Sequence, residues 1–143
     1  GVINAATGAA PAPYDTWSVS KGLTPSNNGP EQDPDSDGIA NLLEFVLGGD
    51  PLSPDAGTLP TVLVSSGSLV FTFTRDDASE SEIGLTFQYG SDLTGWADIA
   101  IGAESTEQVT VTENSGSPDT IAVTIPETNA ANGRLFGRLM AVK

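Results

Sequence analysis

The sequence predicts a mainly β protein, built as an antiparallel β-sandwich that is preceded by two short helices. From residue 61 onward, apolar residues alternate with threonine and other polar residues at a period of two, which is typical of half-buried strands. Before that point the apolar residues follow a period closer to that of a helix. A joint rich in proline and glycine at 51–60 separates the two patterns, so a helical region and a strand region are expected in succession.

Two helices are predicted in the first region. One spans residues 14–22, where a proline precedes the segment, Gly22 ends it, and the apolar face would consist of Tyr14, Trp17 and Val19. The other spans residues 39–47, a buried apolar run that is followed by two glycines and a proline. Since an acidic loop joins the two, the expected order is helix, acidic loop, helix.

The second region contains strand-like segments between turn-forming residues, at the short spacing of β-sandwiches. About seven strands are expected, as in sandwiches of the immunoglobulin or fibronectin III-like kind. Their expected positions are 61–65, 69–74, 83–89, 96–101, 109–111, 121–125 and 134–142. The chain is thus divided into an extended arm or linker (1–13), a helix–loop–helix segment (14–56) and a β-sandwich domain (57–143).

The charge of the chain limits its partners. The 143 residues carry 19 acidic and 5 basic side chains, which gives a formal net charge of −14. Such a surface repels phosphate backbones and anionic lipids, so nucleic acid binding is not expected. Membrane insertion is not expected either, because no apolar run approaches the roughly 20 residues that span a bilayer. The chain begins at Gly1 and its single methionine is Met140, from which we expect a processed N-terminus.

The most specific motif is the acidic loop at residues 33–44, which has the donor spacing of a twelve-residue calcium loop. Carboxylates occupy loop positions 1, 3, 5 and 12, and Gly38 lies at position 6, where such loops turn sharply. Calcium prefers about six to eight oxygen ligands, which alternate carboxylates that curl around one point can supply. The predicted ligands are the side chains of Asp33, Asp35, Asp37, Asn41 and Glu44 and the main-chain carbonyl of Ile39.

A calcium loop of this kind suits the millimolar calcium found outside cells. Together with the high acidity and the many Ser and Thr residues, it predicts an extracellular or cell-surface location. We expect calcium to be structural here, because one loop beside a sandwich offers no second state to which it could switch.

The loop also resembles a known family. The run Asp-x-Asp-x-Asp-Gly-Ile-x-Asn-x-x-Glu, followed by Gly48-Gly49-Asp50-Pro51, is similar to bacterial thrombospondin type 3-like calcium repeats and to one half of a dockerin or an EF-hand. The resemblance implies the same six calcium ligands, with Asp50 as a further candidate. The helix–loop–helix resembles the one that precedes a C-terminal β-sandwich module in many secreted bacterial proteins. Such modules are also similar to this chain in the segment 91–96 and in the pair Arg138-Leu139. A dockerin pairs two loops where this chain has one, so cohesin binding is not expected.

No catalytic site is predicted. The sequence has no histidine, which removes the commonest general base, and its best-grouped carboxylates belong to the metal loop. The cluster Arg75-Asp76-Asp77 is interpreted as a polar turn at the end of a strand. We therefore expect a non-catalytic, calcium-stabilised structural or adhesive module.

Two functional hypotheses remain open at this point. The arm 1–13 is uncharged and rich in Ala, Gly and Pro, and we expect it to dock on its own domain or on a neighbouring copy, where it would make the protein a subunit of a surface filament. Adjoining domains of a larger secreted protein are further expected partners. The alternative is a carbohydrate-binding accessory module of a secreted hydrolase, whose glycan platform would consist of Tyr14, Trp17, Tyr89 and Trp96.

Overall fold

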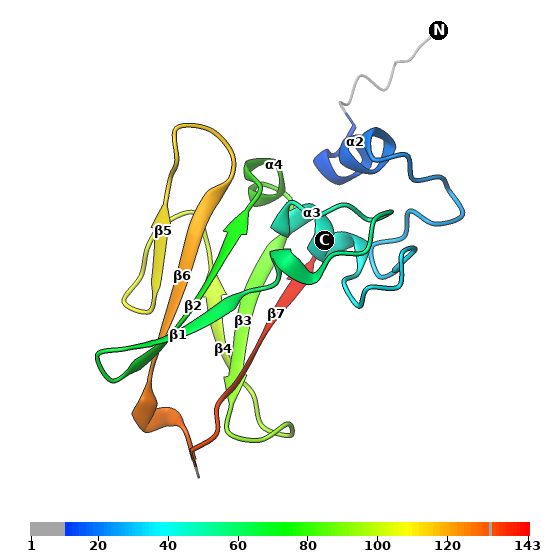
Figure 1. The fold of residues 1–143 in the computed structure, drawn as a ribbon. Helices are drawn as coiled ribbons and strands as arrows, with labels where there is room; N and C mark the ends of the chain where they lie inside the picture. The colour runs from blue at the N-terminus through cyan, green and yellow to red at the C-terminus, as the bar shows by residue number, and fades with distance from the viewer. Residues whose placement is uncertain (1–10, 132) are drawn as a thin grey trace, which may run out of the picture.

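The computed structural model describes residues 11–131 and 133–143, and within them two antiparallel sheets lie face to face, with the short α-helices near one end (Figure 1). The predicted arm falls almost wholly on residues 1–10, outside the described residues. In the described part of the chain, no helix is long and apolar enough to cross a membrane.

Seven strands form the two sheets. The first sheet has the order β1-β2-β6-β5 and the second has the order β4-β3-β7, and all neighbouring strands are antiparallel. Their bounds are β1 (Thr61–Ser65), β2 (Ser68–Arg75), β3 (Gly84–Gly90), β4 (Ala97–Ile101), β5 (Val109–Thr112), β6 (Asp119–Pro126) and β7 (Phe136–Val142). Each strand overlaps one of the predicted segments, so the prediction of a mainly β, two-sheet protein is confirmed.

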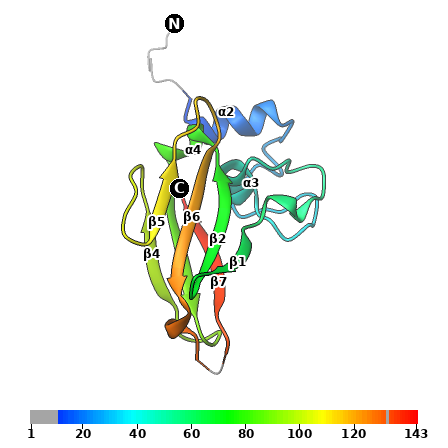
Figure 2. The ribbon, with the colours of Figure 1, turned by 60° about the vertical axis from the view of Figure 1, so that its left-hand side comes forward.

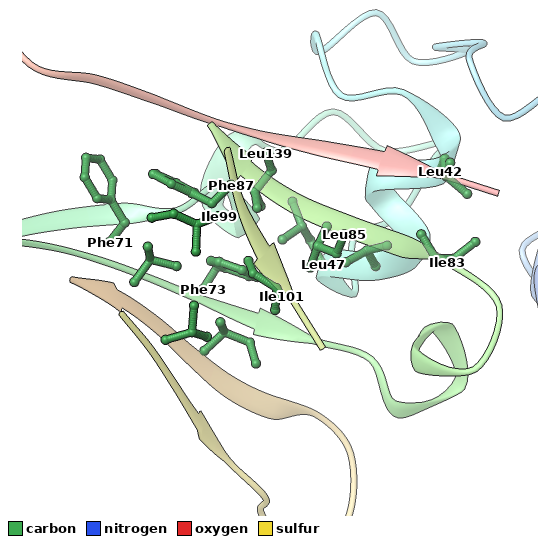
Figure 3. Close-up of a cluster of buried hydrophobic side chains, with 14 of the residues drawn as sticks. Leu42, Leu47, Phe71, Phe73, Ile83, Leu85, Phe87, Ile99, Ile101 and Leu139 are labelled. Carbon is green, nitrogen blue, oxygen red and sulfur yellow. The ribbon is translucent and has the colours of Figure 1, made fainter. Parts of the chain in front are cut away.

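The core lies between the two sheets because the period-two pattern turns one face of each strand inward. On β6, alternate residues from Ile121 to Ile125 are fully buried. Phe71 of β2 and Phe87 of β3 meet across the core with ring centroids 4.8 Å apart. Figure 3 shows these rings beside Phe73, Ile99 and Leu139, which come from both sheets. This shared apolar layer holds the sheets together.

Among the described residues, three α-helices lie near one end of the sheets: α2 (Pro13–Ser20), α3 (Asn41–Leu47) and α4 (Asp77–Glu80). Two short 3₁₀ turns, η1 (Ala56–Thr58) and η2 (Glu127–Asn129), complete the regular structure of the described residues. Both predicted helices are present, whereas α4 was not predicted and starts where the side chain of Asp76 accepts a hydrogen bond from Ala78 N.

The predicted apolar face of α2 is partly wrong. Tyr14 and Trp17 pack on Phe45 of α3, with ring centroids 5.7 and 5.3 Å from it. Val19, however, is 74% exposed. Val19 is two residues from Trp17, and residues two apart on a helix point to different sides, so only Tyr14 and Trp17 face α3.

Helix α3 packs against both β2 and β7 and so lies over the side of the sandwich where the two sheets part (Figure 2). Its side chains Leu42 and Leu47 reach the apolar core near Ile83 and Leu85 (Figure 3). The helix ends at Gly48, whose φ of 82° is the left-handed conformation that glycine adopts at low cost. With only seven residues, α3 depends on its neighbours rather than on its own helical propensity.

Candidate metal centre

Three carboxylates of the acidic loop converge at one point. Asp33, Asp35 and Asp37 each offer an oxygen atom, and these three atoms all lie within 4.8 Å of one another. The loop takes this path because Gly38 adopts a φ of 90° at its sharp turn, where Gly38 N donates to Asp33 Oδ2 at 2.9 Å. The structure therefore brings together three of the predicted ligands.

Hydrogen bonds from the main chain orient these carboxylates. Asp37 Oδ1 accepts from Ile39 N at 2.9 Å, and Asp37 Oδ2 accepts from Asp55 N at 3.0 Å. These two hydrogen bonds, that from Asp55 first, lower the pKa of Asp37. Asp35 differs, because burial raises its pKa. Asp37 is thus held ionised at neutral pH beside a carboxylate that is less readily ionised.

Several oxygen atoms around the loop are buried and accept no hydrogen bond from the residues described. They are Asp33 Oδ1, Asp35 Oδ2, Asn41 Oδ1, Glu44 Oε1 and Glu44 Oε2. Buried oxygens normally have hydrogen-bond donors, since leaving one without a partner costs about 1–3 kcal/mol. A group of such oxygens in one loop is the donor set that a hard cation prefers, so the residues present fit calcium.

Glu44 extends this group from α3. It is 1% exposed and lies against Asp37. Burial, and then the charges of Asp37 and Asp35, raises the pKa of Glu44 to about 7. A carboxylate so placed is costly to ionise unless a cation shares the site. Glu44 thus lies where the helix meets the acidic loop, in surroundings that disfavour its ionised form.

The other two predicted ligands have different surroundings. Asn41 is fully buried, and its Nδ2 donates to Asn27 O and Gly29 O, both at 2.9 Å. Its amide is therefore fixed toward the segment before the loop, while its Oδ1 accepts no hydrogen bond from the described chain. Ile39, at position 7 of the twelve-residue loop, has a buried side chain. The ligand roles of Asn41 and of the Ile39 carbonyl stay predictions.

The start of α3 is tied to the segment that precedes the loop. Asn41 N donates to Gln32 O at 2.8 Å, and Leu42 N donates to Pro30 O at 2.9 Å. These main-chain carbonyls satisfy amide groups that a capping side chain would satisfy in other helices. The first turn of α3 is thus fixed to residues 30–32, which directly precede the loop.

A second acidic group includes the first residue of α4, where the sequence predicted only a polar turn. Asp77, Glu113 and Asp119 bring oxygen atoms within 4.8 Å of one another. In this group an arginine side chain supplies the positive charge, because Arg75 Nη2 lies 3.1 Å from Asp119 Oδ2. Burial opposes ionisation of Asp119, but hydrogen bonds with Glu113 and Arg75 lower its pKa. Sequence reasoning missed this group because its members are far apart in the chain.

The predicted aromatic residues do not share one exposed face. Tyr14 is 2% exposed. It packs beside Trp17, and both of these α2 side chains contact Phe45 of α3. Trp96 stacks under Arg138, with the guanidinium carbon 3.9 Å from the ring centroid. Tyr14 is therefore a core residue and is not available to stack on a sugar.

The fold and the loop define a two-sheet antiparallel β protein with a candidate cation site beside one short helix. Comparisons of this chain with protein-family models, with curated protein sequences and with solved structures found no match.

Proposed function

We propose that residues 33–44 bind one calcium ion and that the protein is a non-catalytic, calcium-stabilised structural or adhesive module of the extracellular space. The observation that carries this proposal is the convergence of Asp33, Asp35 and Asp37 beside Glu44, with buried oxygen atoms that accept no hydrogen bond from the described residues. Such an arrangement is repulsive without a cation and favourable with one.

The ion would act as a clamp on α3. Glu44 lies on this helix, and the first amide groups of the helix bind the segment that leads into the loop. At its other end, Val46 O accepts from Asp76 N at 2.7 Å, which fixes α3 to the end of β2. Calcium at the loop would therefore hold α3 over the sandwich, which is a structural role. In its specific form, the proposal is a subunit of a surface filament that assembles through its N-terminal arm.

The calcium proposal is tested by thermal melting with and without calcium. A ligand that binds only the folded state stabilises it by about 2.7 kcal/mol when its concentration is one hundred times its dissociation constant. The melting temperature should therefore rise by several degrees when millimolar calcium replaces a chelator. An unchanged melting temperature at millimolar calcium would contradict a structural calcium site.

The matched variants are Glu44→Gln and Glu31→Gln, because Glu31 is an exposed glutamate outside the loop. Glu44→Gln should lose most of the calcium-dependent rise, since an amide is a poor substitute for a carboxylate ligand. Without calcium, the same variant should melt no lower than the natural chain, because the substitution removes a buried charge that is costly to ionise. Glu31→Gln should keep the full calcium response.

A further inference from the structure

The order of the strands leaves one position beside β7 without a neighbour. In seven-stranded immunoglobulin-type sandwiches, a four-stranded sheet packs on a sheet in which the last strand pairs with the strand before it. Here the first sheet has the same four-stranded order, but β7 pairs with β3 alone among the strands described, and its other edge carries no strand. On the facing sheet, β1 is likewise an edge strand, paired with β2.

An opening lies between these two edges, with a mainly apolar lining in which Arg138 and Glu127 are the charged residues. One part of it, with a volume of about 330 Å³, is lined by Val62, Phe71 and Leu139. A second part, of about 470 Å³, is lined by the apolar side chains of Val64, Leu69 and Leu135 and, at one side, by Glu127. We call this surface the β1–β7 opening. Two edge strands and an apolar lining are what an added strand requires, because main-chain hydrogen bonds and side-chain burial become available together.

The exposure of β1 supports this reading. Val62 pairs with Phe71 and Val64 pairs with Leu69, so both valines point to the core side of their sheet. They are nevertheless 55% and 64% exposed. Core-facing valines with this exposure indicate that the opening is incompletely covered by the described chain.

We propose that residues 2–10 of one copy insert as an additional strand into the β1–β7 opening of the next copy, an inference that rests on the filament form of the proposed function. Residues 1–14 contain no charged side chain, so all 24 charged side chains of the protein lie after them. In a chain of net charge −14, this segment can therefore enter the opening without burying an ionic side chain of its own.

The length and the side chains of the segment also fit the opening. The nine residues of the segment outnumber the seven residues of β7, and in extended form they span roughly 30 Å. Pro11 has no amide hydrogen to donate, which limits pairing to the residues before it. Alternation directs either Val2 or Ile3 toward the core, followed by small residues. Small residues suit the site, because the rings of Phe71 and Phe87 already fill the space beside Gly137.

A second copy is a better donor than the arm of the same chain. Helix α2 starts at Pro13, and Asp15 in its first turn lies 3.7 Å from Lys143, so the arm leaves from the end of the molecule where β7 finishes. At that end, Pro30 and Leu42 lie beside Ala141 at the edge of β7. The chain's own helix–loop–helix segment therefore covers the nearer part of the edge, whereas the far part, near Val64 and Leu135, is open to another molecule.

The test uses substitutions in the full chain and measures mass by light scattering over a concentration series in calcium. Val64→Asp places a charge in the opening, and Leu63→Asp places the same charge on the outer face of β1, where Leu63 is 68% exposed. The double variant V2D/I3D changes the arm. We expect the natural chain and Leu63→Asp to form larger species with rising concentration. Val64→Asp and the double variant should each associate at least about tenfold more weakly.

Mixing the two assembly-deficient variants is the decisive measurement. Val64→Asp keeps an intact arm and the double variant keeps an intact opening, so the two should combine into a 1:1 complex although neither assembles alone. A monomeric natural chain, assembly of Val64→Asp equal to that of Leu63→Asp, or no complex in the mixture would each overturn the inference. Melting curves of the same variants report folding and the calcium response separately, so failure of arm insertion is distinguishable from failure of the calcium clamp.

Discussion

Glu44 is the residue at which the loop and the helix meet. Its carboxylate lies against Asp37 and also feels the charges of Asp35 and Asp50, while its own burial keeps water away. In water, these charges would be screened and their repulsion would be small. At this buried position, burial and repulsion together favour the protonated form, and a bound cation would reverse that preference.

Calcium-free protein should therefore lose stability as the pH rises. The pKa of Glu44 is raised from its ordinary value of 4.5 to about 7, so the folded state favours protonated Glu44. This contribution is fully present below the unfolded pKa and is lost as the pH rises through the folded pKa. It amounts to at most about 3–4 kcal/mol, because one pKa unit corresponds to about 1.4 kcal/mol.

The measurement is urea denaturation of calcium-depleted protein at several values between pH 4.5 and pH 8. Glu44→Gln isolates the effect, since other carboxylates that titrate in this window are shared by both proteins. The natural chain should lose more stability than Glu44→Gln across the window. Parallel pH profiles for the two proteins would show that Glu44 is not a strained carboxylate.

The sequence predicts local relations between residues better than distant ones. The spacing of Asp33, Asp35 and Asp37 was sufficient to predict that they meet, because a single tight loop determines their positions. The hydrogen bond from Asp55 N to Asp37 joins residues that are 18 positions apart, and no local pattern indicates it. The meeting of Asp77 with Asp119 depends on strand pairing, which a single sequence does not specify.

At the scale of elements, α3 and the glycines after it form one unit with the loop. A Cβ atom on Gly49 would collide with Glu44 Oε2. The φ angle of Gly49 lies outside the left-handed region, so its backbone conformation would accept an alanine. Gly49→Ala should therefore displace the Glu44 carboxylate and weaken calcium binding by about tenfold or more. Calorimetric titration with calcium measures this change directly.

Gly102→Ala is the matched control for this substitution, because a Cβ atom on Gly102 meets nothing within 4 Å in the described structure. It should bind calcium as the natural chain does. Equal affinities for Gly49→Ala and Gly102→Ala would mean that Glu44 is not a calcium ligand.

Element positions were predictable where periodicity was clear. The alternation in 61–142 reflects burial of one strand face, and it placed all seven strands. The pairing of β2 with β6 was not predictable, because it joins segments that are separated by three other strands. Helix α4 was missed because four residues are too few to show a helical period.

At the scale of the whole molecule, Arg75 joins distant parts of the fold. It lies at the end of β2, and its Nη2 contacts Asp119 of β6 while its Nη1 donates to Gly102 O after β4 at 2.7 Å. The side chains of Arg75 and Asp119 are both buried, at 3% and 0% exposure. Arg75 therefore connects the two sheets near α4 and compensates the acidic group around Asp119.

Arg75→Met should destabilise the protein by about 3 kcal/mol or more, because it leaves the buried Asp119 without its cation. Arg134→Met is the control, since Arg134 is exposed, and it should change stability by about 0.5 kcal/mol or less. Urea denaturation gives both values. Equal stability of the two variants would show that the buried ion pair is not needed to hold the sheets at this end.

The central claim is that calcium at residues 33–44 clamps α3 onto the sandwich, and hydrogen exchange tests it most directly. Amide exchange should be followed for residues 41–47 of α3 and residues 119–126 of β6, in millimolar calcium and in chelator. The account predicts that calcium slows exchange across α3 and leaves β6 almost unchanged. Equal exchange of α3 with and without calcium would contradict it.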